Sequence, residues 1–157
     1  MFIGISEDRL HHILGVARKA YEISINLGYD EEFAQKMFTL GWLHDIGYEF
    51  SQNPSEHTEI SADMLYSLIG VPLTDEQKLN LDAIRQHGKY PVTKSIEWRI
   101  LTTADMLVDY DGKEVDVMTR LQHIKDRYGE HSDQYLTACD ICYLIGLTAV
   151  NLASLIT

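Results

Sequence analysis

The stretch GWLHDIGYEF, residues 41–50, places a histidine beside an aspartate directly after an apolar run. A glycine follows two residues after the aspartate, as is typical of the end of a helix. A buried carboxylate such as Asp45 is costly unless it is paired or holds a metal ion. We therefore expect the rest of the chain to bring partners to His44 and Asp45.

Apolar residues recur at three- and four-residue spacing along most of the chain, which predicts helices. Ser6 is a predicted N-cap, and Thr74 with Gln77 has the pattern of a capping box. No segment favours a strand. The predicted helical segments span about 6–28, 30–47, 55–70, 73–88, 92–109, 115–128 and 132–157.

This pattern predicts an all-α protein, a single compact helical bundle of about six to eight helices. The 157 residues, 45% of them hydrophobic and 24% charged, suit one globular domain without a disulfide or structural metal. Within it we expect a site-bearing core over about residues 9–109 and C-terminal helices over 113–157.

The formal net charge of −11 argues against a surface that grips nucleic acid, because phosphate neutralisation needs clustered Lys and Arg. It leaves room for a small phosphorylated substrate, since divalent cations create a positive site inside an acidic protein. The start of the chain, with Glu7, Asp8 and Arg9, does not resemble a signal peptide. We expect a cytoplasmic protein that does not enter a membrane.

The C-terminal segment raises two further questions. Cys139 and Cys142 form a lone CxxC in an apolar helical stretch, which favours two packed thiols over a zinc or redox site. The apolar tail that follows is short for a membrane span and contains polar residues. We expect a core helix or a homodimer interface formed by the C-terminal helices.

Nitrogen and oxygen donors fall on five of the predicted helices, near helix ends or among small and apolar residues. Inward-facing His and carboxylate side chains are how helical bundles build metal sites. His11 and His12 point about 100° apart on a helix, so at most one of them faces the core. His123 and His131 lie in polar stretches and are expected to be exposed or hydrogen-bonded.

The order His, then His-Asp, then Asp in an all-helical chain resembles the HD-domain superfamily of metal-dependent phosphohydrolases. LHDIG is a form that the hallmark doublet takes in many members. HILGVARKA matches the first ligand with His12 rather than His11, and ILTTADMLVD matches the last with Asp105. The resemblance covers roughly residues 9–109 and implies that His12, His44, Asp45 and Asp105 bind metal.

Two more histidines extend the resemblance to the subset of the superfamily that holds two metals. SEHTEISADML and AIRQHGKY supply His57 and His87 in the matching order. Short bacterial members that hydrolyse dinucleoside tetraphosphates share this pattern. So do cyclic-di-nucleotide phosphodiesterases, but their glycine-tyrosine-proline signature is not matched, and Tyr48 stands where many of them carry Lys.

The resemblance implies a division of labour among these residues. Asp45 would bridge two ions, with His12, His44 and Asp105 on one and His57 and His87 on the other. Neutral imidazoles and carboxylates suit iron or manganese, with zinc, cobalt, nickel or magnesium as alternatives. A hydroxide generated between the ions would attack phosphorus, and no serine or cysteine nucleophile is required.

We expect the substrate to be a small phosphate ester, nucleotide-like, with Lys89 and then Lys94 as its cationic contacts. Lys89 follows His87 by two residues, and Lys94 begins the helix that carries Asp105. Two alternatives stay open at this point. One is a mixed-valent di-iron oxygenase of the same superfamily, which has the same ligands, and the other is a non-catalytic metal-binding sensing module.

Overall fold

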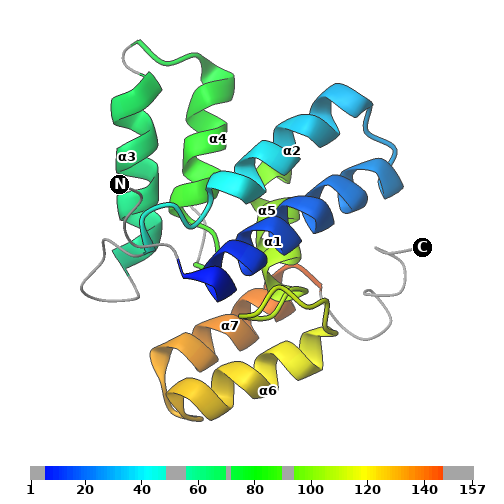
Figure 1. Cartoon of the computed structure of the whole chain (residues 1–157), viewed down its shortest axis with the longest axis vertical. Coiled ribbons are helices and arrows are strands. Elements are labelled where there is room, and N and C mark those ends of the chain that lie inside the picture. The colour runs from blue at the N-terminus through cyan, green and yellow to red at the C-terminus, as the bar shows by residue number, and fades with distance from the viewer. Residues whose placement is uncertain (1–5, 49–55, 70–71, 90–93, 147–157) are drawn as a thin grey trace.

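The computed structural model describes residues 6–48, 56–69, 72–89 and 94–146 (Figure 1). These residues form an all-α fold, as the sequence predicts. Its described helices are α1 (Glu7–Asn26), α2 (Glu31–Leu43), α3 (His57–Ile69), α4 (Asp75–Arg85), α5 (Ile96–Met106), α6 (Val117–Tyr128) and α7 (Asp133–Leu144). Among the described residues, extended pairing is limited to one isolated bridge between Val108 and Glu114. The predicted start at Ser55 and the helix expected over 147–157 lie outside these ranges.

Side-chain caps set most of the helix starts. Ser6 accepts a hydrogen bond from the backbone of Arg9 at the start of α1, which confirms the predicted N-cap. Thr74 and Gln77 form the predicted capping box of α4. The starts of α2, α5, α6 and α7 have the same design, with a Ser or Asp oxygen accepting the N–H three residues later: Asp30, Ser95, Asp116 and Ser132.

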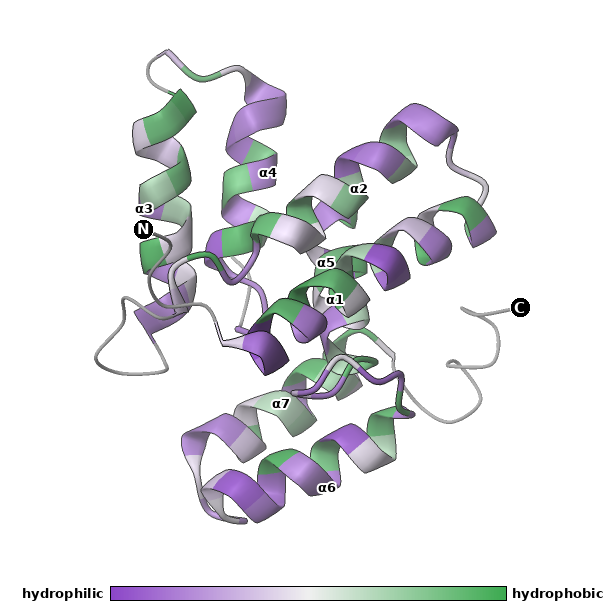
Figure 2. Ribbon diagram, in the orientation of Figure 1, coloured by the Kyte–Doolittle hydropathy of each residue, from purple (hydrophilic) through white to green (hydrophobic). Residues whose placement is uncertain are grey.

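The helices are arranged as three pairs around α5. Figure 1 shows α1 beside α2, α3 beside α4, and α6 beside α7 at the opposite end of the molecule from α3 and α4. Apolar side chains of every pair enter one core, among them Val16, Met37, Ala62, Ile84, Leu101, Ile124 and Ile141. Polar and apolar residues are interspersed along α1, α2, α4 and α6 in Figure 2, as expected for helices with one buried face.

The end of α2 differs from the expectation. The helix ends at Leu43 rather than at Gly47, and residues 44–47 form turns. Gly47 does not stop the helix through a left-handed conformation. Instead its N–H donates to Ser61 Oγ at 2.8 Å, and a Cβ at this position would lie 2.5 Å from the backbone nitrogen of Ser61. The glycine allows the turn to touch α3.

A second glycine lets α1 and α2 cross closely. A Cβ on Gly41 would lie 2.6 Å from the Cα of Ala17, closer than real Cβ atoms approach a neighbour. Gly41 therefore brings the end of α2 against α1, and Gly47 brings the turn that follows against α3. His12 and His57 are carried by these two helices.

Several expectations concern features away from this turn. Cys139 and Cys142 are free thiols, and Cys142 lies in the core. Burial, and to a lesser extent the neighbouring Cys139, raises the pKa of the Cys142 thiol to about 12. No helix in the described part of the chain is both long and apolar enough to cross a bilayer. The division into a core over 9–109 and C-terminal helices, and the homodimer, stay predictions.

Candidate metal centre

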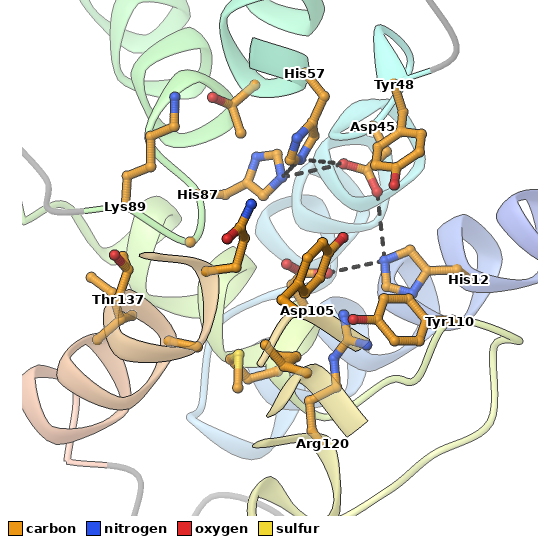
Figure 3. Close-up of a pocket in the computed structure, with 18 of the residues that line it drawn as sticks. His12, Asp45, Tyr48, His57, His87, Lys89, Asp105, Tyr110, Arg120 and Thr137 are labelled. Atoms are coloured by element: carbon orange, nitrogen blue, oxygen red, sulfur yellow. Dashed lines mark hydrogen bonds and ion pairs between the residues drawn. The ribbon is translucent and has the colours of Figure 1, made fainter. Parts of the chain in front are cut away.

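The structure brings all six expected ligand residues together, and five of them, all but His44, line one cavity (Figure 3). They come from α1, the turn after α2, α3, the turn after α4, and α5. His12 is 1% exposed whereas His11 is exposed, so the assignment of the first position to His12 agrees with the fold. The converging residues are His12, His44, Asp45, His57, His87 and Asp105.

Backbone carbonyls orient three of the four imidazoles. His44 follows the end of α2 and donates its Nδ1–H to the carbonyl of Gly41 at 2.6 Å. His87 follows the end of α4 and donates in the same way to Ile84 at 2.6 Å. Both rings thus bind carbonyls in the last turn of a helix. The result is that each Nε2 points into the cavity.

His12 has an equivalent partner from further along the chain. Its Nδ1 lies 2.9 Å from the backbone carbonyl of Asp109, just after α5. A hydrogen bond from Nδ1–H to this carbonyl fixes the ring and leaves Nε2 as the ligand atom, which is the usual support of metal-binding histidines. All three buried rings therefore offer the same nitrogen.

The two oxygens of Asp45 face different pairs of imidazoles. Oδ2 lies 3.2 Å from His44 Nε2 and 3.6 Å from His12 Nε2. Oδ1 lies 3.2 Å from His57 Nε2 and 3.3 Å from His87 Nε2. This is the arrangement of a carboxylate between two ligand groups, one on each oxygen.

Asp105 completes the first of these groups. Its Oδ1 lies 3.0 Å from His12 Nε2 and 3.6 Å from His44 Nε2. Ligand atoms at about 2.1 Å from one ion and roughly 90–110° apart lie about 3.0–3.4 Å from each other. The 3.0 Å distance lies in this range and the 3.6 Å distance slightly above it, and His12, His44 and Asp105 have the mutual proximity that a metal site needs.

Two buried atoms test whether a cation fits. Among the described residues, neither His44 Nε2 nor Asp45 Oδ1 has a hydrogen-bond partner of good geometry, although both are fully buried. Buried polar atoms are nearly always satisfied. A nitrogen and a carboxylate oxygen without donors, in a cluster without sulfur, fit a divalent cation.

In the absence of a metal ion, the carboxylates of the cluster favour the protonated, positively charged form of His44. Burial alone lowers the pKa of His44, but the attraction of Asp45 and Asp105 outweighs it and raises that pKa to about 10. Burial likewise opposes ionisation of Asp45 and Asp105, yet the histidines around them hold the pKa of both carboxyls well below its ordinary value. Desolvation lowers the pKa of His87.

The match to known families agrees with this geometry. The family model described as the HD domain matches residues 9–110, well over half of the chain. This chain belongs to the HD-domain family. The superfamily consists mostly of metal-dependent phosphohydrolases, and its members bind divalent metals. Comparison with curated proteins and with solved structures gave no match.

The HD-domain core also carries contacts that the sequence pattern did not indicate. Arg9 donates to Asp45 Oδ2 at 2.9 Å, and its guanidinium lies 3.5 Å from the ring centre of Tyr48. The Asp109 carboxylate is paired with Arg120 and with His123. His123 is thus hydrogen-bonded to Asp109, the residue whose backbone carbonyl also contacts His12. His131 is exposed, as expected.

Five of the six residues of the HD site line a cavity of about 420 Å³, and His44 lies fully buried behind its wall. Lys89 lines it too, half-buried, on the wall opposite Tyr48 in Figure 3. Lys94 is exposed ahead of α5 and is not among the lining residues, so its role rests on sequence alone. Helices α6 and α7, beyond the matched segment, supply the remaining wall, including Arg120, Ile124, Tyr128, Thr137 and Ile141.

Proposed function

We propose that this chain is a metal-dependent phosphohydrolase that cleaves a small, nucleotide-like phosphate ester. The observation that carries the proposal is Asp45, whose two oxygens face two separate pairs of imidazoles. Two ions about 3.5–4 Å apart suit phosphoryl transfer, because together they stabilise both the attacking and the leaving oxygen. Membership of a family made up mostly of such hydrolases supports it.

In this proposal His12, His44 and Asp105 hold one ion, His57 and His87 hold the other, and Asp45 lies between them. Ions held there, iron or manganese by donor type, would supply a water acidified to react near neutral pH and positive charge at the phosphoryl oxygens. The backbone carbonyls keep the Nε2 atoms of His12, His44 and His87 aimed at the centre. No cysteine or serine is needed as a nucleophile.

The cavity supports a small anionic substrate. Its volume of about 420 Å³ lies within the range of roughly 300–1,000 Å³ that is usual for small-molecule sites. The whole chain has a net charge of −11, but the lining contains three cations, Arg9, Lys89 and Arg120. We assign Lys89 to the non-reacting oxygens of the substrate phosphate, as a mobile point charge.

The test is phosphate release by protein loaded with manganese or with iron, from p-nitrophenyl phosphate, nucleoside phosphates and dinucleoside polyphosphates. Hydrolysis under strict anaerobiosis is the expected result. Turnover that requires oxygen would support the oxygenase alternative and contradict the proposal. Fully metal-loaded protein that cleaves none of these compounds would instead favour a sensing module.

Two lysine variants refine the assignment of substrate contacts. Lys89→Ala should retain metal and raise KM by about tenfold, because a charged contact contributes on the order of 1.5 kcal/mol. Lys94→Ala removes the same charge from an exposed position outside the cavity lining. Equal effects of the two substitutions would mean that only net charge matters and that Lys89 makes no direct contact.

A further inference from the structure

Arg120 is a buried charged side chain that the proposed hydrolysis does not yet use. It lies on α6, beyond the segment 9–110 that matches the family, and is only 6% exposed. Figure 3 shows it at the end of the cavity below Asp105 and Tyr110. It lines the same cavity as five of the six candidate ligands.

The contacts of Arg120 leave one of its donors unused. One terminal nitrogen donates to Asp109 Oδ1 at 3.3 Å, and the guanidinium lies 4.5 Å from the ring centre of Tyr110. Its Nε–H, although buried, finds no acceptor among the described residues. A buried donor left unsatisfied costs about 1–3 kcal/mol, so an acceptor from outside the protein is expected here.

Asp109 ties this guanidinium to the metal centre. Its backbone carbonyl accepts the hydrogen bond of His12, while its carboxylate accepts from Arg120. One residue therefore sets the position of a candidate metal ligand and of a cation in the cavity. Such rigid coupling is what a substrate-positioning group requires.

A second unsatisfied donor lies on the opposite side of the fold. Thr58 of α3 is 1% exposed and lines the cavity, and its Oγ1 has no hydrogen-bond partner among the described residues. Helices α3 and α6 lie at opposite ends of the molecule in Figure 1. A ligand in the cavity would meet polar groups from both.

We propose that Arg120 is a substrate-binding residue whose Nε–H donates to an anionic oxygen of the substrate phosphate. This inference rests on the proposed function and assigns part of phosphate recognition to the α6–α7 pair rather than to the family-matched core. A guanidinium suits this role because it stays charged and its hydrogen bonds to phosphate are charge-assisted. The Thr58 hydroxyl is a second donor available to the same ligand.

Arg127 provides a matched control for the test. It lies on the same helix and its guanidinium lies 4.2 Å from the ring centre of the same Tyr110, but it is exposed and does not line the cavity. Arg120→Gln and Arg127→Gln therefore make the same change in charge beside the same ring. Only the first removes, from a residue that lines the cavity, a buried donor that is unpaired in the described part of the chain.

The experiment is binding of inorganic phosphate to manganese-loaded protein by titration calorimetry, with metal content measured for every sample. Arg120→Gln should weaken binding at least about tenfold, the usual effect of losing a charged hydrogen bond, while Arg127→Gln changes it less than about twofold. Both should keep the manganese content of the wild type. Equal losses in the two variants would overturn the inference.

Arg120→Lys covers the case in which the Gln variant loses metal or fails to fold. Lysine keeps the charge but lacks the Nε–H, so phosphate binding should again weaken with manganese content unchanged. Binding at the wild-type level would show that charge alone suffices, and loss of metal in this variant would show a purely structural role. Either result contradicts the assignment.

The outcomes also separate this inference from the proposed function. Phosphate binding requires no turnover, so wild-type protein that binds phosphate through Arg120 and cleaves no ester would contradict only the proposed hydrolysis. Hydrolysis with no difference between Arg120→Gln and Arg127→Gln would contradict only the inference. A KM effect without a kcat effect in Arg120→Gln is the expected kinetic counterpart.

Discussion

At the scale of single residues, Asp45 has the most demanding position in the molecule. It is 3% exposed, adjoins another buried residue in sequence, and contacts four imidazoles and one guanidinium. Each of its oxygens belongs to a different ligand group. Loss of this carboxylate should therefore affect both groups at once, which no other side chain in the cluster is placed to do.

Asp45→Ala should bind neither ion and lose all turnover of any ester that the wild type cleaves. The reason is that both groups lose their shared oxygen ligand, while the imidazoles that remain repel one another when protonated. Elemental analysis of protein reconstituted with manganese checks the first part and an activity assay the second. Retention of both metal and rate would contradict the interpretation of LHDIG as a metal-binding doublet.

His57→Ala should be milder than Asp45→Ala. Within the cluster His57 contacts Asp45 Oδ1 and His87, and its loss leaves the group of His12, His44 and Asp105 complete. We expect the metal content to fall from about two ions to about one, with residual activity strongly reduced. Two ions and full activity in this variant would favour a mononuclear site.

The raised pKa of His44 predicts proton release on metal binding. Free imidazole, with a pKa of about 6.5, is already neutral at pH 8. With a pKa of about 10, His44 still carries its proton at pH 8 in the metal-free protein, and a cation at Nε2 must displace it. Metal affinity should thus keep rising with pH between about 6.5 and 10.

Calorimetry at pH 8 in buffers of different ionisation enthalpy measures this release. We expect close to one proton per chain, because the pKa of His87 is lowered and those of Asp45 and Asp105 lie well below their ordinary values. These three groups have no proton left to release at that pH. A release near zero would show that His44 is neutral before metal binds.

At the scale of helices, the turn after α2 matters because two other helices pack against it. Gly47→Ala would place a Cβ against the backbone of α3 at Ser61. We expect a loss of about 1–3 kcal/mol in the free energy of unfolding, as for overpacking in a core. Since α3 carries His57, its displacement should also weaken the second ion selectively.

Denaturant unfolding and metal analysis check this prediction together. Gly129→Ala is the control, because Gly129 has a φ of +99° and a Cβ added there would meet no atom within 4 Å. It should lower stability through backbone strain and leave the metal content unchanged. A Gly47→Ala variant that is destabilised yet binds two ions would contradict the coupling between turn and site.

Local signals are sufficient to predict most of the helices. Ser6 and Thr74 begin helices as their cap patterns indicate, because capping depends on residues three apart. The predicted end of α2 at Gly47 is wrong, since a glycine that allows close packing looks the same in sequence as one that stops a helix. Only the contact with Ser61 distinguishes the two.

The six clustered residues could be predicted because their order follows a family pattern, and the structure brings them together. Their supporting contacts could not. Arg9 and Asp45 are 36 positions apart, and His12 and Asp109 are 97 apart. Ion pairs and carbonyl contacts over such distances leave no periodicity or spacing in the sequence, so only the packing of α1 against α5 and the turn after α2 shows them.

At the scale of the whole molecule, metal should contribute to folding stability, because the ligands come from five parts of the chain that meet only in the folded state. Chelation should lower the melting temperature, and added metal should restore it by mass action. At a metal concentration near 100 times Kd the shift is roughly 5–10 °C for a chain of this size.

Differential scanning calorimetry with and without chelator measures this shift. Asp45→Ala is the control, because a variant unable to bind metal should melt at the same temperature in both conditions. An unchanged melting temperature of metal-loaded wild type after complete chelation would show that these residues are not gathered at one site in the native state.

The carbonyl contacts of the three buried imidazoles affect which amino-acid substitutions this chain can accept during evolution. Their acceptors are peptide groups of Gly41, Ile84 and Asp109, and every amino acid supplies such a group. A family whose histidines were oriented by carboxylates could lose that orientation through one codon change. In this chain no particular side chain is needed at the acceptor positions to hold the tautomers, although Gly41 must stay a glycine for the packing of α2 on α1. To weaken these hydrogen bonds directly, the accepting peptide bond itself would have to be changed, for example to an ester, because no side-chain substitution removes the carbonyl.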